Sequence, residues 1–249
     1  MRYYPGNTVA HYVTKLSERI LLDGEYEVGL AEIIYPHSWF NVDNRDKKYW
    51  FAFTLVGTMF VKNYLPSGYY NSAEDFVREL TEQAQEAFSN QVDFSVQFVY
   101  DNKTNKIRIQ VTSRHNVDGV TLSPELKRFL GFDGDWSVTK EPNRIADRVF
   151  ELNGGVSLIY VYCDIAGYTI VGDTKAPLLR VCNVKGKHGD IVRITYDQPH
   201  YVPLSRRDFD TVEIHINNEL GQPMPFEFGK SVVTLHFQRR HEKALLLRR

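Results

Sequence analysis

The chain has 249 residues, with 30 Lys and Arg against 31 Asp and Glu, which gives a formal net charge of −1 at pH 7. This balance gives no support to a protein that binds nucleic acid or a membrane surface through its overall charge. No apolar run approaches the roughly 18–20 residues that span a bilayer, and the N-terminus lacks the basic-then-apolar layout of a secretory signal, so we expect a protein made inside the cell without a membrane anchor.

The N-terminal part of the chain alternates apolar and polar residues with the period of a β-strand. Residues 8–34 predict two or three strands broken by a turn at Leu22-Asp23-Gly24, and Trp50 to Val56 predicts another strand. The aromatic-rich segment Tyr35–Asn41 lies between them. We expect this segment to form a loop, because Pro36 interrupts strand pairing.

Residues 65–135 show a different pattern. Ser72-Ala73-Glu74-Asp75 is a capping box, and the apolar stripe that follows it at four-residue spacing predicts a helix. A hairpin comes next, with strands at Phe94–Tyr100 and Ile107–Val111, and then a short helix between Ser123 and Gly131. We therefore predict a small helix–hairpin–helix insertion over residues 65–135. The stripe consists of Phe76, Leu80, Ala84 and Phe88.

The last hundred residues return to short, regularly spaced strands. Turns at Gly221-Gln222-Pro223 and Gly229-Lys230 separate some of them. Such spacing is typical of a β-sandwich rather than a parallel α/β sheet. The predicted fold class is therefore mainly β, a single jelly-roll β-sandwich over residues 1–249 that carries the insertion. We expect its later strands at residues 157–163, 178–184, 190–196, 211–217 and 231–238.

The segment Val156–Val184 has the densest β pattern in the chain and no catalytic motif. Its two strand runs are apolar on both faces, which predicts that both faces are covered. Gly167 and Gly172-Asp173-Thr174 superficially resemble a phosphate-binding loop, but Asp173 replaces the lysine that such a loop requires. We interpret this part as a fixed crossing between core strands.

No other motif in the chain predicts an enzyme or a cofactor site. The two cysteines, Cys163 and Cys182, lie within predicted strands, where burial makes a thiol a poor nucleophile. A disulfide between them requires their strands to be neighbours. His215 and His236 fall on the outward faces of late strands, and we expect solvated side chains rather than metal ligands. The sequence therefore predicts no catalytic residue, cofactor or metal.

A series of short motifs in order along nearly the whole chain resembles the penton (minor capsid) proteins of Polinton/Maverick elements and adintoviruses. No motif alone is as specific as a zinc signature, and the residues from about His241 onward carry little of the likeness. The motifs are Tyr4–Thr8, Glu27–Ile33, Tyr35–Trp39, Leu65–Tyr70, Leu130–Phe132, Tyr160–Ile165, Ile170–Asp173, Pro177–Arg180, Pro199–Arg206, Pro225–Lys230 and Val233–Phe237.

This resemblance implies a structural role without enzymatic activity. Proteins of this family are similar in role to the pentons of virophages and adenoviruses. The resemblance implies a single jelly roll that forms homopentamers at the five-fold vertices of an icosahedral shell. The implied neighbours are trimers of a double jelly-roll major capsid protein, and the implied location is the virion, after synthesis in the host cytoplasm.

Five copies around an axis need a heterologous interface, in which one patch meets a different patch of the next copy. Two loops, Tyr35–Asn41 and Pro199–Arg207, carry the Tyr, Trp and Arg side chains that interfaces favour. Loop aromatics that fold back onto their own sheet are the alternative interpretation. The candidate subunit contacts are Tyr35, His37, Trp39, Phe40, Tyr201, Arg206 and Arg207.

The C-terminal residues are basic and partly apolar. They suggest a tail on the inner face of the shell that touches packaged DNA, although a solvated terminus explains the same composition. The basic residues are Arg239, Arg240, Lys243, Arg248 and Arg249.

Two other classes of function remain open from the sequence. A jelly-roll module that binds glycans or a receptor would present residues 65–135 as its ligand surface. A thiol hydrolase would need Cys163 or Cys182 to be accessible beside a histidine.

Overall fold

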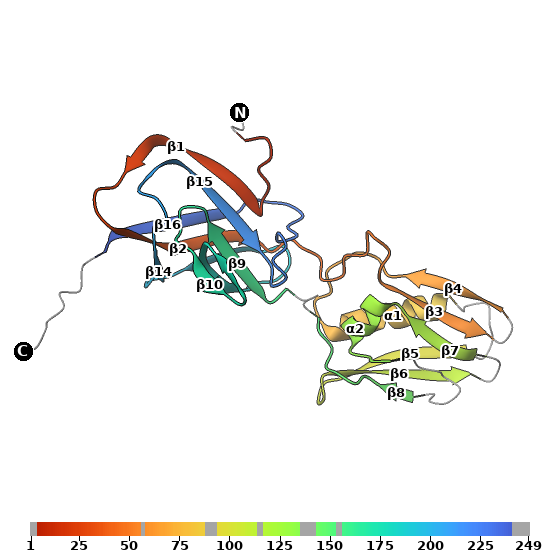
Figure 1. The fold of residues 1–249 in the computed structure, drawn as a ribbon. Coiled ribbons are helices and arrows are strands. Elements are labelled where there is room, and N and C mark those ends of the chain that lie inside the picture. Colours follow the sequence, from red (N-terminus) through yellow and green to blue (C-terminus); the bar gives the residue numbers. More distant parts are fainter. Residues whose placement is uncertain are drawn as a thin grey trace, which may run out of the picture. The chain divides into compact units, whose positions relative to one another are not determined.

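The chain folds into two compact units, each with its own core (Figure 1). The first unit combines Met1–Trp39 with Val156–Arg249, and the second is the continuous segment Phe40–Gly155. The second unit is thus inserted between two strands of the first. The computed structural model describes residues 4–55, 58–87, 94–113, 117–134, 143–152 and 156–240.

The first unit consists of β-strands. In chain order they are β1 (His11–Leu21), β2 (Tyr26–Pro36), β9 (Leu158–Cys163), β10 (Thr169–Val171), β11 (Thr174–Ala176), β12 (Leu178–Asn183), β13 (Ile191–Thr195), β14 (Tyr201–Pro203), β15 (Asp208–Asn217) and β16 (Val232–Arg239).

These strands form the jelly roll that the sequence predicts. One antiparallel sheet has the order β1-β15-β9-β12. In the other, β2 pairs with β13 and β14 on one side and with β16 on the other. Strands from the two ends of the chain therefore lie side by side, red and orange next to blue in Figure 1. The five later strands predicted from alternation are confirmed to within a few residues.

The core of the first unit lies between these two sheets. Val28, Leu30 and Ile33 of β2 are fully buried in one cluster with Ile159 and Val161 of β9. From Val212 to Asn217 the inward residues of β15 alternate with outward ones, as period-2 patterning requires. Burial of this apolar surface is the main stabilising contribution to the sandwich.

Strand β9 corrects one prediction. It is an inner strand, paired with β15 and β12, but only its Ile159, Val161 and Cys163 side is buried. On the other side Tyr160 and Tyr162 are partly exposed, and their rings stack on each other with centroids 6.4 Å apart. Tyrosine suits a partly buried position, because its apolar ring can pack on the sheet while its polar hydroxyl remains in water.

The second unit mixes strands and two helices. In chain order it contains β3 (Trp50–Leu55), β4 (Thr58–Tyr64), α1 (Ala73–Glu86), β5 (Phe94–Asp101), β6 (Lys106–Ser113), β7 (Val117–Leu122), α2 (Pro124–Leu130) and β8 (Asn143–Ile145). The strands form two three-stranded sheets, with the orders β4-β3-β7 and β5-β6-β8.

Both predicted helices begin where the sequence places their caps. The Ser72 hydroxyl accepts the Asp75 amide at 3.0 Å, and the Ser123 hydroxyl accepts the Leu126 amide at 3.2 Å. Gly131 ends α2 in the left-handed conformation, with φ 83°. Phe76, Leu80 and Ala84 are buried as the stripe predicts. Phe88 lies outside the described residues.

The second unit is wider than the predicted insertion of residues 65–135. Its core includes Phe51 and Phe53 of β3, which the sequence analysis assigned to the jelly roll. The Phe51 ring lies 6.4 Å from that of Phe98 on β5 and has no exposed surface. Alternation along β3 predicts a strand correctly but does not say which sheet the strand joins.

Candidate functional site

The first predicted contact loop, Tyr35–Asn41, begins as the end of β2 and is mostly buried. Tyr35, His37 and Trp39 are 0%, 3% and 2% exposed. Their rings pack together, with His37 stacked on Trp39 at 4.0 Å between centroids. Phe40 is partly exposed. Tyr35, His37 and Trp39 offer no surface to another subunit, so their prediction as subunit contacts is wrong.

Hydrogen bonds to the segment before β13 hold this loop inside the first unit. The Tyr35 hydroxyl accepts the Lys185 amide at 2.9 Å. The His37 amide donates to the Asp190 carbonyl, and the His37 carbonyl accepts the Gly189 amide. Burial lowers the pKa of His37, so its imidazole stays neutral in this apolar setting.

The second predicted loop, Pro199–Arg207, stays at the surface. Tyr201 starts β14 and its ring lies against Gly29 of β2, where an added Cβ would be 3.1 Å from the ring. The Tyr201 hydroxyl shares a hydrogen bond of 2.9 Å with His236 of β16. Tyr201 therefore bridges the two strands that flank β2 on its outer face.

Arg206 and Arg207 are exposed and ion-paired within the first unit. Arg206 pairs with Asp164, and Arg207 pairs with Glu25 at 2.6 Å. Arg240 approaches the other oxygen of Glu25 at 3.7 Å. Exposed pairs of this kind contribute about 0–1 kcal/mol each, so these arginines could change partner at little cost.

The structure describes only the first two basic residues of the predicted tail, up to residue 240. Arg239 is the last residue of β16 and pairs with Tyr26, and the Arg240 amide donates to the Glu25 carbonyl at 2.8 Å. Arg239 and Arg240 thus belong to the sheet end, and their prediction as part of a tail is wrong. Lys243, Arg248 and Arg249 lie outside the described residues.

An apolar surface that the sequence analysis missed crosses the outer face of the β2 sheet. Ile191 of β13 pairs with Pro36, and Val232 of β16 pairs with Ile34, so all four side chains point to the same face. Ile191 is 78% exposed and Val232 is 48% exposed. The nearby turn adds Phe228, which is 55% exposed. We call Ile191, Phe228 and Val232 the apolar sheet face.

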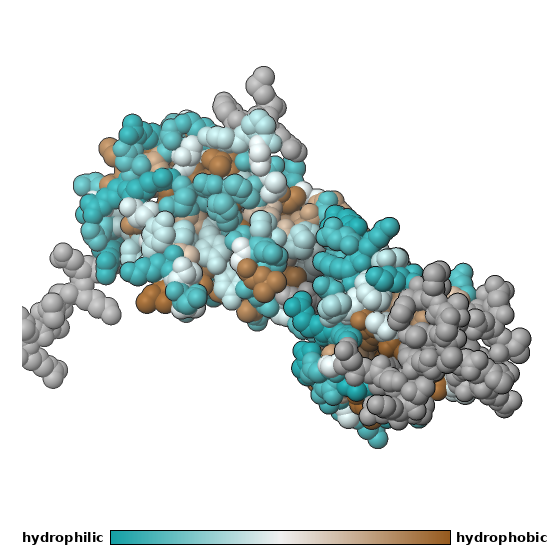
Figure 2. Space-filling view, turned by 45° about the vertical axis from the view of Figure 1, so that its right-hand side comes forward, coloured by the Kyte–Doolittle hydropathy of each residue, from teal (hydrophilic) through white to brown (hydrophobic). Residues whose placement is uncertain are grey.

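Exposed apolar residues elsewhere are more scattered. Figure 2 shows small hydrophobic groups within a largely hydrophilic surface on the face that it presents. Ile170 is as exposed as Ile191 but lies on the two-stranded β10–β11 hairpin, opposite Lys175. Single exposed apolar residues are normal, whereas a group that spans two strands and the nearby turn suggests a contact surface.

The residues considered for thiol or phosphate chemistry lie within the strands and a hairpin of the first unit. Cys163 and Cys182 are buried free thiols, and burial raises the pKa of both, that of Cys163 to about 12. The segment that resembles a phosphate-binding loop forms the β10–β11 hairpin, whose turn contains Gly172 with φ 62°. The described chain continues from this turn into the strands β11 and β12, not into a helix whose amides could bind an anion.

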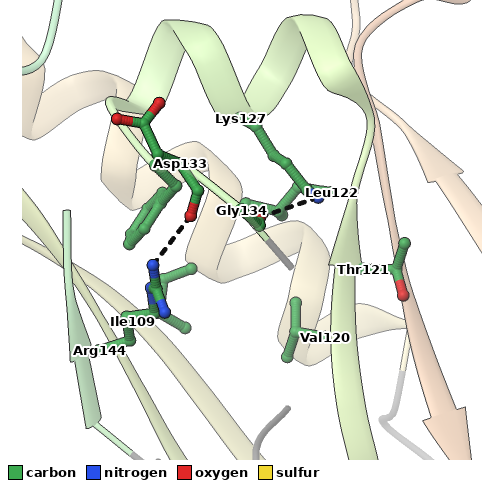
Figure 3. A pocket seen from close by; sticks show the side chains of 9 residues that line it. Ile109, Val120, Thr121, Leu122, Lys127, Asp133, Gly134 and Arg144 are labelled. Carbon is green, nitrogen blue, oxygen red and sulfur yellow. Dashed lines mark hydrogen bonds between the residues drawn. The ribbon is translucent and has the colours of Figure 1, made fainter. Parts of the chain in front are cut away.

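The second unit contains a cavity of about 120 Å³ between β6, β7 and α2 (Figure 3). Ile109, Val120 and Leu122 form its apolar walls. At its rim Lys127 donates to the Gly134 carbonyl at 3.1 Å, and Arg144 donates to the Asp133 carbonyl at 2.9 Å. Typical ligand pockets measure about 300–1,000 Å³, and these cations already bind the backbone of the unit itself.

Neither helix of the described chain is long and apolar enough to cross a membrane.

The sequence matches no model of a protein family and no curated protein. Among solved structures, the crystal structure of the selenomethionine-labelled mavirus penton protein matches with a TM-score of 0.53 and 12% sequence identity. The match covers 92% of this chain and 90% of that chain. The chain shares the fold of that protein. The shared fold includes both units, because the aligned share exceeds what either unit could supply alone.

Proposed function

We propose that the chain is a structural capsid protein, a penton that forms homopentamers at the five-fold vertices of an icosahedral shell. The observation that carries the proposal is the fold match to the mavirus penton protein over nine-tenths of both chains. A match of that extent includes the insertion as well as the jelly roll, which a generic β-sandwich would lack. The motif series further supports kinship with the pentons of Polinton/Maverick elements and adintoviruses.

A structural role rather than catalysis is part of the proposal. The candidate nucleophiles Cys163 and Cys182 are buried, and burial favours their protonated form. The cavity between β6, β7 and α2 is smaller than an ordinary substrate pocket, and the hollow of about 430 Å³ beside α1 and β5 is widely open to solvent. Loops on a rigid sandwich remain free to vary as contact surfaces instead.

The apolar sheet face is the surface we assign to the contact between neighbouring copies. A closed ring needs a patch on one copy that meets a different patch on the next. Burial of Ile191, Phe228 and Val232 would stabilise that contact by about 25 cal/mol per Å² of apolar area. Tyr201, Arg206 and Arg207 remain candidates for polar contacts with a neighbouring copy, and Phe40 remains a candidate for an apolar one.

Ile191→Asp tests this assignment. The carboxylate would be placed in the contact, and we expect at least a tenfold weaker pentamer in sedimentation velocity at matched concentrations. Ile170→Asp is the control, because Ile170 is equally exposed and lies on the hairpin instead. If the Ile191→Asp variant and the wild type form equally stable pentamers, with unchanged circular dichroism, the apolar sheet face is not the contact between copies.

We further propose that the pentamer, located in the virion, contacts a double jelly-roll major capsid protein and that residues 241–249 contact packaged DNA. The sequence of this segment contains Lys243, Arg248 and Arg249. Its deletion should weaken DNA binding and flatten the salt dependence, because fewer phosphates are neutralised. Unchanged DNA binding after the deletion would exclude the tail from this role.

A further inference from the structure

Three side chains of types that can bind metal ions, two from β15 and one from β1, meet on the outer face of the first sheet. His11 is the first residue of β1 and pairs directly with His215 of β15. Glu213 lies two residues before His215 and therefore points to the same face. Val212, Ile214 and Ile216, which alternate with these two residues along β15, are buried in the core, so Glu213 and His215 lie on the outer face.

The three side chains converge on a small volume. The imidazole rings of His11 and His215 stack with centroids 4.0 Å apart and an angle of 12° between their planes. Both rings direct Nε2 at the same carboxylate oxygen, Oε1 of Glu213, at 2.6 Å and 3.2 Å. One ligand atom from each residue lies within 4.8 Å of the others.

We infer that His11, Glu213 and His215 form a binding site for a divalent transition-metal ion, with Zn²⁺ as the best fit. Two imidazole nitrogens and one carboxylate oxygen, with water in the fourth position, are a common tetrahedral Zn²⁺ ligand set. Ligand atoms about 2.0–2.1 Å from Zn²⁺ are about 3.3 Å apart. The distance from His215 Nε2 to Glu213 Oε1, 3.2 Å, is close to this value, whereas His11 Nε2 lies nearer, at 2.6 Å. Because an imidazole binds a metal in the plane of its ring, the two stacked rings would turn out of their stack to share one ion.

The surroundings of the cluster suit a cation. Glu213 supplies a carboxylate oxygen, and the Nε2 atoms of both imidazoles already face it. Mg²⁺ and Ca²⁺ prefer all-oxygen sites, so the two imidazoles select against them. Each of the three side chains is partly buried, which leaves room for a water ligand.

The backbone on both strands is fixed around the site. The Glu213 amide donates to Asp164 at 2.8 Å, and Asp164 is in turn paired with Arg206. Before β1, the His11 amide donates to the Thr8 hydroxyl at 3.0 Å, and Asn7 makes two hydrogen bonds with the backbone of Val13. Such outer contacts position metal ligands before the ion arrives.

The bound ion would attach the first strand to the rest of the jelly roll. Strand β1 is an edge of its sheet, with β15 as its partner there. An ion held by His11 on one strand and by His215 and Glu213 on the other cross-links the two. Because the unfolded chain does not bring these strands together, binding stabilises the folded state. This inference does not depend on the role in a capsid.

Isothermal titration of the chelator-treated full chain with ZnCl₂ tests the site. We expect one ion per chain at micromolar or lower Kd, no comparable binding of MgCl₂, and at least tenfold weaker binding by His215→Gln. Zn²⁺ should raise the Tm of the wild type and leave that of His215→Gln unchanged. Co²⁺ should give the intense visible absorption of a tetrahedral complex in the wild type only.

His236→Gln is the matched control. His236 lies on the outer face of the other sheet, and its hydrogen bond to Tyr201 can be kept by glutamine. This variant should bind Zn²⁺ like the wild type. Equal affinities of the wild type and the His215→Gln variant, with both folded by circular dichroism, would overturn the inference and leave the cluster as an ion-paired surface group.

Discussion

The two units of the chain are built from the sequence in opposite ways. The jelly roll takes strands from both ends, so that β1 pairs with β15 and β2 with β16. The second unit is the continuous segment Phe40–Gly155. Two of its strand pairs, β3 with β4 and β5 with β6, join strands that are consecutive in the chain, and the pairing of β3 with β7 stays within the same segment. Loop closure therefore costs less entropy in the second unit than in the first.

This difference implies that the second unit can unfold cooperatively and separately from the first. Its core residues come only from positions 42–152, whereas those of the jelly roll come from both flanking segments. Substitution within one core should therefore loosen that unit first.

Phe76→Ala should have the largest effect on the second unit. The Phe76 ring has no exposed surface and packs against Tyr70, Phe129 and Phe150 at 4.9–5.5 Å between centroids. Removing a buried phenylalanine ring costs about 3–5 kcal/mol. Hydrogen exchange measured by mass spectrometry should show faster exchange in α1 and β6 and unchanged exchange in β2 and β15.

Trp39→Ala is the counterpart in the first unit. The Trp39 ring packs on His37 and on Phe226, and its loss should cost about 3–5 kcal/mol there. Exchange should now rise in β2 and β15, while α1 and β6 keep their protection. If either substitution loosened both units to the same extent, the chain would be one cooperative body and the comparison would fail.

Gly131→Ala should destabilise the second unit by a smaller amount. Gly131 has φ 83°, and a Cβ there would collide with the Arg148 carbonyl oxygen. The backbone strain alone costs about 1–3 kcal/mol, and the collision adds to it. Gly134→Ala is the control, because Gly134 has φ 69° and open space around it. Chemical denaturation that gave the same loss for both variants would show that the close approach to Arg148 is unimportant.

Local sequence patterns predict most of the secondary structure. Ser72 and Ser123 fix the starts of the helices because a cap acts on amides three residues away. Alternation in β15 identifies its buried side because neighbouring residues of a strand face opposite ways. Both signals lie within a few residues of the feature that they predict.

Features that depend on distant residues could not be predicted. The boundary at Phe40 depends on β3 pairing with β7 rather than with a jelly-roll strand. Tyr35 and Trp39 have the composition of an interface loop, and only the backbone of residues 185–190 shows that they are internal. The pairing of His11 with His215 spans nearly the whole chain, so no local motif reveals the cluster.

Ionisation of the two buried thiols should have the smallest predicted effect on stability. Because Cys163 and Cys182 both lie in the core of the first unit, it should affect that unit alone. Burial raises the pKa of Cys163 to about 12, whereas an unfolded thiol ionises near 8.5. The thiolate therefore favours the unfolded state, and the first unit should lose stability as pH rises above that ordinary value. Alkylation by iodoacetamide at pH 8 should be slow in the wild type and in Phe76→Ala, and faster in Trp39→Ala. Fast alkylation of the folded wild type would contradict the burial of both thiols.

The mass of the assembled full chain under native conditions tests the proposed function most directly. Native mass spectrometry over a range of protein concentrations should show a species of five chains that grows with concentration, and image averaging of that species should show a five-fold ring. A particle that stays monomeric at high concentration, or that closes as a trimer, would contradict a penton role for this chain.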